Sequence, residues 1–276
     1  MLDEATPTHT ANPRRIGIFD SGVGGLSVLR ELRRECPGAH FHYVADSGHA
    51  PYGERSEAHV RARSLALASH LISGGAGIVV IACNTATAVA VQTLRKAWPQ
   101  TPIVGVEPGI KPALATTRNG RVGVMATRGT LNSEKFKRLV SALAPREPLH
   151  LRACDGLAAA IEDGFADALK VLSLVERHCR PLRDAAVDTV VLGCTHYAFA
   201  RQQIQAALGP AVQIIDTAAA VAKHVARIEP QTESASRDAA QTTPPLLLQT
   251  TGNAEKLGRI ASTLLGETVE ASYITA

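Results

Sequence analysis

Ile78-Val79-Val80-Ile81-Ala82-Cys83-Asn84-Thr85 is the stretch that decides the fold, because an apolar run leads into a cysteine and then a polar pair. Valine and isoleucine favour strands, so this run predicts a buried strand with a thiol at its carboxyl end. In open α/β sheets, ligands bind at the carboxyl ends of the strands. Cys83 is therefore the first candidate site residue.

A second copy of this pattern lies at Thr189-Val190-Val191-Leu192-Gly193-Cys194-Thr195-His196-Tyr197. It again combines an apolar run, a small residue, a cysteine and a threonine. The chain of 276 residues has room for one large domain or for two of about 100 to 150 residues, and the repeat favours two similar lobes. We expect two thiols at two strand ends, acting as paired proton-transfer groups.

The composition, 45% hydrophobic but only 4% aromatic, is typical of an α/β protein in which small residues let helices lie close on a sheet. Expected strands alternate with expected helices, which predicts mainly parallel sheets flanked by helices. Strands are expected at 16–19, 40–45, 78–82, 102–106, 121–126, 150–153, 187–192, 213–216 and 246–252. Helices are expected at 27–35, 57–72, 88–97, 133–143, 157–161, 168–179, 217–227 and 254–265.

This order suggests a division of the chain into lobes. Residues 1–15 are expected to be a flexible leader, 16–106 with 217–276 the first lobe, and 107–216 the second. The segment 229–245 is rich in Gln, Thr, Ser and Pro and is expected to be a mobile surface loop without an assigned function. In the helix 168–179, spacing places Leu169, Leu172 and Val175 on one face.

Charge and cysteine content argue against several classes of protein. The net charge of +4 comes from scattered basic residues without interleaved aromatics, which argues against a nucleic-acid partner. No apolar run approaches the ~18 residues of a membrane span, and the leader has no signal-peptide pattern. Five cysteines without a CxxC pair indicate neither zinc nor a full set of disulfides, and fit a reducing cytoplasm.

The glycine-rich turn Gly22-Val23-Gly24-Gly25 follows an expected strand that ends at Asp20 and Ser21. It lacks the G-x-G-x-x-G pattern of dinucleotide sites, so no cofactor is expected there. The glycines instead permit a close approach of helix and sheet. We expect Asp20 and Ser21 to face the same cleft as Cys83.

Several chemistries remain open for the two repeated thiols. A metal site would need a tightly spaced ligand pair, a single nucleophile would leave the second cysteine unexplained, and a disulfide would need Cα atoms under ~7 Å apart. A reaction in which one thiolate removes a proton from a carbon and the other thiol returns one to the opposite face uses both cysteines. A helix amino terminus beside each cysteine would favour its thiolate form. Cys36, Cys154 and Cys179 are expected to be inert buried residues.

Four motifs in order resemble the glutamate racemases, a family of the cofactor-independent aspartate/glutamate racemase superfamily. These motifs are Ile16 to Leu26, Ala45-Asp46-Ser47 with Pro51-Tyr52-Gly53, Ala82 to Ala86, and Leu192 to Tyr197. The resemblance runs from Ile16 to Thr251. It implies two pseudo-symmetric α/β lobes with the active site between them, and interconversion of L- and D-glutamate without metal or pyridoxal phosphate. It also implies a cytoplasmic homodimer that supplies D-glutamate for peptidoglycan and cell shape.

The resemblance implies a role for individual residues as well. Cys83 would be the base on D-glutamate and Cys194 the base on L-glutamate, each serving as the acid in the other direction. Asp20 and His196 would be the auxiliary polar groups beside the first and second cysteine. The positions that match the family's substrate-binding residues are Asp20, Ser21, Pro51, Tyr52, Gly53, Asn84, Thr85, Thr195 and His196.

One departure from the family pattern affects the second lobe. Cys154-Asp155-Gly156 lacks the proline that often follows the cysteine, so Glu162 is held only as a candidate auxiliary acid. Two other functions stay open: a racemase acting on aspartate or a hydantoin, and a module that binds without turnover. The contacts to the substrate's side-chain carboxylate distinguish a glutamate racemase from one acting on aspartate or a hydantoin. A turnover assay distinguishes an enzyme from a module that only binds.

Overall fold

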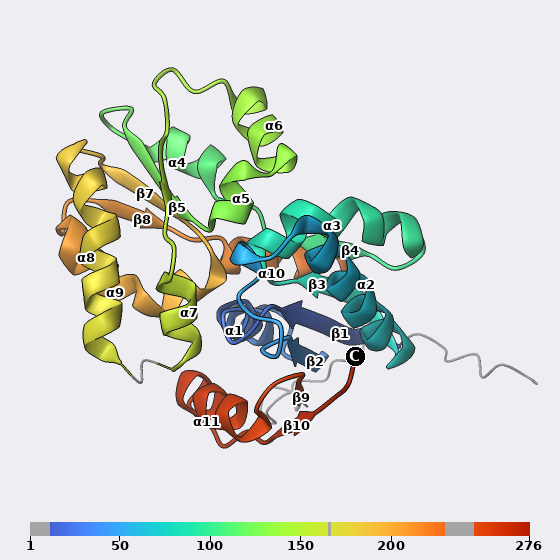
Figure 1. Cartoon of the computed structure of the whole chain (residues 1–276). Coiled ribbons are helices and arrows are strands. Elements are labelled where there is room, and N and C mark those ends of the chain that lie inside the picture. The colour runs from blue at the N-terminus through green and yellow to red at the C-terminus, as the bar shows by residue number, and fades with distance from the viewer. Residues whose placement is uncertain (1–11, 165–166, 230–245) are drawn as a thin grey trace, which may run out of the picture.

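The computed structural model describes residues 12–164, 167–229 and 246–276, and it contains two parallel sheets flanked by helices (Figure 1). The α/β prediction is therefore confirmed. The expected loop 229–245 lies outside the described residues except for Glu229, and so does the leader up to residue 11. Residues 12–15, which were expected in the flexible leader, instead begin the first strand, where Asn12 pairs with Ala76 of β3 and Arg15 with His40 of β2.

The first sheet has the strand order β10-β9-β2-β1-β3-β4 with every ladder parallel. Its strand β1 lies between β2 and β3, and the two strands from the end of the chain, β9 and β10, extend the sheet beyond β2. The strands are β1 (Asn12–Asp20), β2 (His40–Ala45), β3 (Ala76–Ile81), β4 (Ile103–Gly105), β9 (Leu246–Thr250) and β10 (Ala271–Tyr273). The helices around them are α1 (Leu26–Glu35), α2 (Glu57–Ser73), α3 (Asn84–Ala97), α10 (Ala218–Ile228) and α11 (Ala254–Leu265).

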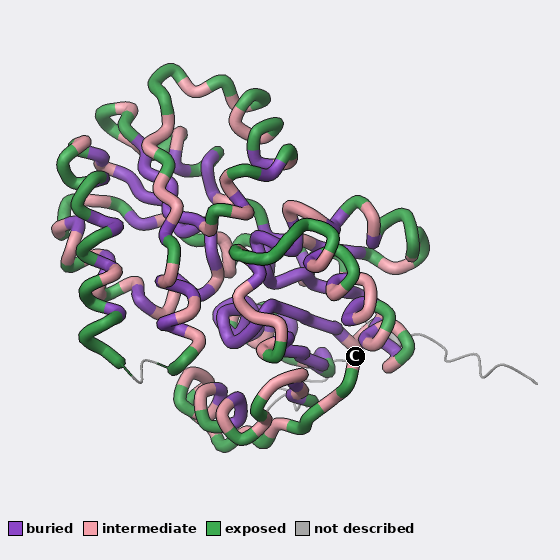
Figure 2. Tube along the Cα trace, viewed as in Figure 1, coloured by how far each residue is buried: buried purple, intermediate pink, exposed green. Residues whose placement is uncertain are grey.

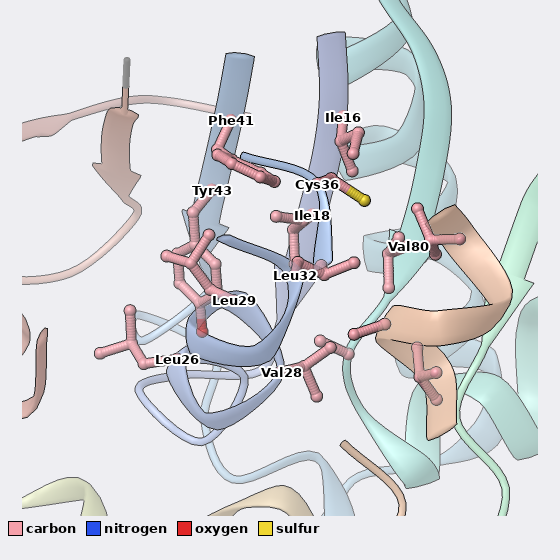
Figure 3. Packing of buried hydrophobic residues seen from close by; sticks show 14 of the residues in the cluster. Ile16, Ile18, Leu26, Val28, Leu29, Leu32, Cys36, Phe41, Tyr43 and Val80 are labelled. Atoms are coloured by element: carbon pink, nitrogen blue, oxygen red, sulfur yellow. The ribbon is translucent and has the colours of Figure 1, made fainter. Parts of the chain in front are cut away.

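Side chains that alternate along the strands fill one core on each face of this sheet. Ile16 and Ile18 of β1 pack with α1, α10 and α11, whereas Phe19 packs on the other face with α2 and α3. Figure 3 shows Leu29 and Leu32 of α1 directed at the first face. Each fully buried leucine contributes about 2 kcal/mol of apolar burial, which holds α1 and the loop before it in place.

The second sheet has the order β6-β5-β7-β8 and is also parallel. Its strands are β5 (Val122–Ala126), β6 (His150–Ala153), β7 (Thr189–Gly193) and β8 (Gln213–Ile215). On one face lie the helices α4 (Ile110–Thr116) and α6 (Glu134–Leu143), and on the other α7 (Leu157–Glu162), α8 (Ala168–Asp184) and α9 (Arg201–Leu208). The short helix α5 (Arg128–Asn132) and the 3₁₀ turns η1 (Tyr52–Glu54) and η2 (Thr195–Ala200) complete the element order.

The predicted face of the helix 168–179 is wrong. Val175 is buried, but Leu169 and Leu172 are 78% and 48% exposed. The helix continues to Asp184, and its buried stripe runs through Val171, Val175, Cys179 and Leu182 at intervals of three or four residues. Figure 2 shows the outer side of α8 exposed. Within the expected helix the buried stripe already runs through Val171 and Val175, and spacing alone did not distinguish it from the stripe of Leu169 and Leu172.

Helix α3 begins four residues earlier than expected, at Asn84 directly after Cys83. Asn and Thr are weak helix formers, so the sequence favoured a loop there. Helices α4, α5 and α9 and strand β10 were not expected at all. Among the described residues, no helix has both the length and the apolar character needed to span a bilayer.

Candidate active site

The candidate site residues gather where parallel strands end. Asp20 is the last residue of β1, Cys83 follows β3 by two residues, and Cys194 directly follows β7. Because β1 and β3 are neighbours in the first sheet and β7 is central in the second, Cys83 and Cys194 come from different sheets. The two strand ends meet, because Thr195, the residue after Cys194, lies with its Oγ1 3.5 Å from Oδ1 of Asp20.

Cys83 is held by the start of α3. Its Sγ accepts a hydrogen bond from the Ala86 N–H at 3.5 Å and lies 3.8 Å from Ser21 Oγ. The side chain is only 5% exposed, and burial, followed by the charge of Asp20, raises its pKa above that of an ordinary thiol. The expectation that the helix terminus would leave a thiolate is therefore wrong for Cys83, because desolvation outweighs the helix.

Cys194 has different surroundings. It precedes the 3₁₀ turn η2 without making a side-chain cap, and its Sγ lies 3.8 Å from Nδ1 of His196. The other ring nitrogen of His196, Nε2, is 2.7 Å from Oε2 of Glu162. Burial alone would lower the pKa of His196, but hydrogen bonds to Cys194 and Glu162 raise it well above its usual range. These two contacts therefore favour the protonated form of His196 beside Cys194.

Glu162 joins the site although the family's proline is missing. Gly156 adopts φ of 80° before α7, a conformation that glycine accepts without strain, and α7 then delivers Glu162 at its last residue. Glu162 Oε2 accepts the Val23 N–H at 2.8 Å, and Oε1 accepts the Ser47 hydroxyl at 2.7 Å. This carboxylate therefore connects His196 with two loops that follow strands of the first sheet.

Asp20 is fully buried at the end of β1. Its Oδ2 accepts the N–H groups of Gly22 at 3.2 Å and Gly25 at 2.9 Å, and its Oδ1 lies 3.5 Å from Thr195 Oγ1. Burial raises the pKa of Asp20 to about 6, with the charge of His196 acting in the opposite direction. This carboxylate thus changes protonation close to neutral pH.

The glycine turn after β1 touches residues of the second sheet directly. A Cβ on Gly24 would lie 2.3 Å from Nδ1 of His196, and one on Gly22 would lie 2.1 Å from Oε2 of Glu162. Real Cβ atoms do not approach so closely. The turn therefore needs glycine because side chains of η2 and α7, which pack with the second sheet, occupy the space.

The expected substrate-binding positions are brought to the same strand ends. Ser21 and Asn84 are buried beside Cys83, and Thr195 is half-buried beside Cys194. Within the part of the chain that the structure describes, Nδ2 of Asn84 is buried and has no hydrogen-bond partner. Such an unsatisfied donor next to a thiol is suited to a polar ligand.

The Pro51-Tyr52-Gly53 loop faces residues that were not predicted. Tyr52 is buried, and its hydroxyl donates to Asp46 at 2.5 Å. Gly53 packs against Thr127, which directly follows β5.

Thr127 and Thr130 were missed by the sequence reasoning, together with Ser47 as a partner of Glu162. Thr85 Oγ1 lies 2.9 Å from Thr127 Oγ1 and 3.3 Å from Thr130 Oγ1, which forms a cluster of three hydroxyls from both sheets. The position of Thr127 immediately after an apolar strand is the signal that would have found it.

A cavity of about 300 Å³ lies beside Glu162. Pro51, Ser47 and Lys256 are among the residues that line it, so it borders both the loop after β2 and helix α11. No group of three or more His, Cys, Asp or Glu within residues 12–164, 167–229 and 246–276 has the arrangement of a metal site.

Comparison with known proteins assigns this arrangement to a family. The model of the Asp/Glu/Hydantoin racemase family matches residues 16–225. The chain belongs to the Asp/Glu/Hydantoin racemase family. It is therefore placed among the amino-acid racemases, which are isomerases.

Relatives in this family are similar over nearly their whole length. A glutamate racemase of Ectopseudomonas mendocina is 44% identical over 252 residues, which cover 91% of this chain and 95% of the relative. The structure of glutamate racemase isoform RacE1 from Bacillus anthracis matches with a TM-score of 0.82 and 31% identity, covering 97% and 98% of the two chains. Escherichia coli glutamate racemase, in complex with L-glutamate and the activator UDP-MurNAc-ala, matches with a TM-score of 0.81 and 30% identity over 94% and 97%.

Proposed function

We propose that this racemase interconverts L- and D-glutamate by proton transfer between two cysteines and the substrate's α-carbon. The observation that carries the proposal is that the strand ends bearing the two cysteines meet: Thr195, next to Cys194, lies 3.5 Å from Asp20, and Ser21, next to Asp20, lies 3.8 Å from Cys83. Each thiol also has its own ionisable neighbour, Asp20 for Cys83 and His196 for Cys194. The names of the relatives support glutamate as the substrate.

In the L-to-D direction, the Cys194 thiolate removes the α-proton and the Cys83 thiol gives a proton to the opposite face. The raised pKa of Cys83 keeps that proton available until the carbanion forms. One C–H bond breaks and another forms, and the two sulfurs exchange protonation states. The starting state returns when a proton passes back to Cys83 through solvent. In the D-to-L direction the roles are reversed.

Hydrogen-bond donors around the thiols are proposed to hold the substrate. We assign this role to the predicted residues Ser21, Asn84, Thr85 and Thr195, of which Asn84 has an unpaired amide. We add the hydroxyl of Thr127, which lies beside that of Thr85. Backbone N–H groups of Tyr52 and Gly53 would serve a carboxylate. Donors at the α-carboxylate also stabilise the negative charge that develops when the α-proton leaves.

The wider role is part of the same proposal. We propose that residues 16–106 with 217–276 and residues 107–216 act as two lobes around a substrate cleft. The enzyme is proposed to work as a cytoplasmic homodimer that supplies D-glutamate for peptidoglycan. The relatedness to glutamate racemases across 91% of the chain supports this assignment.

Isotope exchange in deuterated water tests the reaction. Either enantiomer of glutamate should gain deuterium at the α-carbon while racemising, because the returned proton comes from solvent-exchanged sulfur. Turnover without label would contradict deprotonation. The same assay with L-aspartate and a 5-substituted hydantoin decides the substrate, and glutamate binding without turnover would indicate a module that has lost its chemistry.

A further inference from the structure

The carboxylate of Asp46, directly after β2, is fully buried and accepts four hydrogen bonds. Arg63 of α2 donates to both oxygens, from Nε at 2.9 Å and from Nη2 at 2.8 Å. The Tyr52 hydroxyl donates at 2.5 Å and the Thr251 hydroxyl at 2.7 Å. None of these four hydrogen bonds joins Asp46 to a group that transfers a proton in the proposed reaction. That chemistry therefore does not explain why these residues are bonded together.

This cluster connects three distant parts of the chain. Arg63 also donates from Nη1 to the carbonyl oxygen of Ala276 at 2.5 Å, and Thr251 follows β9. The backbone N–H of Asp46 donates to the carbonyl oxygen of Asp20 at 2.9 Å. Helix α2, the segment after β9 and the final residues are thus tied to the strand end that carries Asp20.

Tyr52 is the member of the cluster that reaches the active site. Its ring packs in the same core cluster as Cys83, and its backbone belongs to the loop that packs against Thr127 through Gly53. With its hydroxyl fixed on Asp46 and its ring buried, Tyr52 has one orientation. That orientation sets the direction of the loop's backbone N–H groups.

We propose that Asp46 and Arg63 are positioning residues, whose buried ion pair holds Tyr52 and so fixes the Pro51–Gly53 backbone to receive a carboxylate of the substrate. This inference rests on the proposed racemase function and deepens it. The pair acts on substrate binding through Tyr52 and transfers no proton itself.

The geometry of the pair explains why both members are needed. An arginine fork that meets both oxygens of a carboxylate fixes orientation as well as charge, which lysine cannot do. Burial by itself would raise the pKa of Asp46, but the bonds from Arg63, Tyr52 and Thr251 keep it below its ordinary value. The carboxylate therefore stays charged and holds Tyr52 across the neutral pH range.

Steady-state kinetics of Arg63→Ala, Tyr52→Phe and the double variant, with L- and D-glutamate, test the inference. We expect Arg63→Ala to raise KM for both enantiomers about tenfold while kcat changes less than about threefold, the pattern of lost ground-state positioning. Tyr52→Phe should raise KM about fivefold, and the double variant should be no worse than Arg63→Ala, because both act through one contact. Arg63→Lys should fall between wild type and Arg63→Ala.

Arg33→Ala is the matched control. Arg33 also forms a two-pronged pair, with Glu267 at 2.6 and 3.1 Å, and it is 12% exposed, close to the 14% of Arg63. It lies on α1, and its pair has no contact with the Tyr52 loop. Its loss should lower the melting temperature and leave KM unchanged.

The outcomes separate this inference from the proposed function. If Arg63→Ala keeps the wild-type KM while its melting temperature falls as in Arg33→Ala, Arg63 is structural and the inference is wrong. If Arg63→Ala does not fold, Tyr52→Phe and Arg63→Lys decide, and wild-type KM in both would also overturn it. A wild-type enzyme that racemises no glutamate would instead overturn the proposed function, and the inference with it.

Discussion

Cys83 and Cys194 follow nearly the same sequence pattern, yet the structure gives them different surroundings. Cys83 caps α3 and lies near the carboxylate of Asp20, which helps to keep its proton bound. Cys194 caps no helix and lies beside a histidine whose pKa is raised. A repeated motif can thus place two thiols at equivalent strand ends, while the residues around each thiol make their acid–base properties different.

Replacing each cysteine gives the largest expected effect. Cys83→Ser and Cys194→Ser should each lower racemisation about 10³-fold or more, because a positioned acid–base group typically contributes that much. If the two thiols face opposite sides, Cys83→Ser should still exchange the α-proton of L-glutamate for deuterium, and Cys194→Ser that of D-glutamate. Proton NMR in deuterated water measures both.

Cys36→Ala provides the control, since Cys36 is buried in the core of the first sheet away from both thiols. Its racemisation rate should stay close to that of wild type. Equal exchange of both enantiomers by both serine variants would show that the two cysteines are interchangeable. Their different surroundings would then not give them different roles.

Asp20 offers a test of the Cys83 side through stability. A carboxyl whose folded pKa is raised to about 6 resists ionisation, so it lowers stability as pH rises from about 4 to about 6. Asp20→Asn should therefore stabilise the protein at pH 7 by up to about 3 kcal/mol and have little effect at pH 4. The asparagine side-chain oxygen can replace Oδ2, which accepts hydrogen bonds from the backbone N–H groups of Gly22 and Gly25.

Chemical denaturation at the two pH values measures this difference. Activity should fall in the same variant, which is the usual conflict between stability and a functional charge. Equal loss of stability at pH 4 and pH 7 would mean that Asp20 serves only as a hydrogen-bond acceptor.

Glu162→Gln tests the Cys194 side. We expect kcat/KM to fall about 30-fold, less than the loss of a group that itself transfers the proton. Because L- and D-glutamate have equal free energies in water, kcat/KM must fall equally in both directions. Losing Glu162 also removes one cause of the raised pKa of His196, so the alkaline limb of the pH–rate profile should move to lower pH.

Asp163→Asn, at the adjacent position, is the control for this shift, because Asp163 pairs with Lys256 and not with His196. Its profile should match that of wild type. An unchanged alkaline limb in Glu162→Gln would show that deprotonation of His196 does not limit the reaction.

The sequence predicted the parts of this site that depend on strand ends. The apolar runs before Cys83, Asp20 and Cys194 are local features, and parallel strands bring their ends together, so those positions could be read directly. The fold class followed from the same alternation of strands and helices. The exposed face of α8 was misjudged because the segment has two apolar stripes, Leu169 with Leu172 and Val171 with Val175, and spacing alone does not decide which one is buried.

What the sequence could not supply is the pairing across the two sheets. Glu162 meets His196 and Val23 only after α7 has been placed, and Thr127 meets Thr85 only after both sheets have been placed. The protonation of Cys83 was also misjudged, because burial is a property of the whole fold and outweighs the local helix terminus. Long-range contacts and desolvation are the two quantities that local patterns do not carry.

Gly22→Ala gives the smallest expected effect and tests whether the contact between the sheets controls the Cys194 side. The new Cβ would lie 2.1 Å from Oε2 of Glu162, so the carboxylate must move away from Val23 and His196. A carboxylate at the end of a side chain can shift, and we expect activity to fall about tenfold with a stability loss of about 1 kcal/mol.

The variant should also shift the alkaline limb of the pH–rate profile in the same direction as Glu162→Gln. In the double variant Gly22→Ala with Glu162→Gln, the two losses should not multiply, because both act by separating one carboxylate from His196. If the losses do multiply, the glycine turn affects catalysis by a second route, through the hydrogen bond from Gly22 to Asp20, and the turn then governs the surroundings of both cysteines.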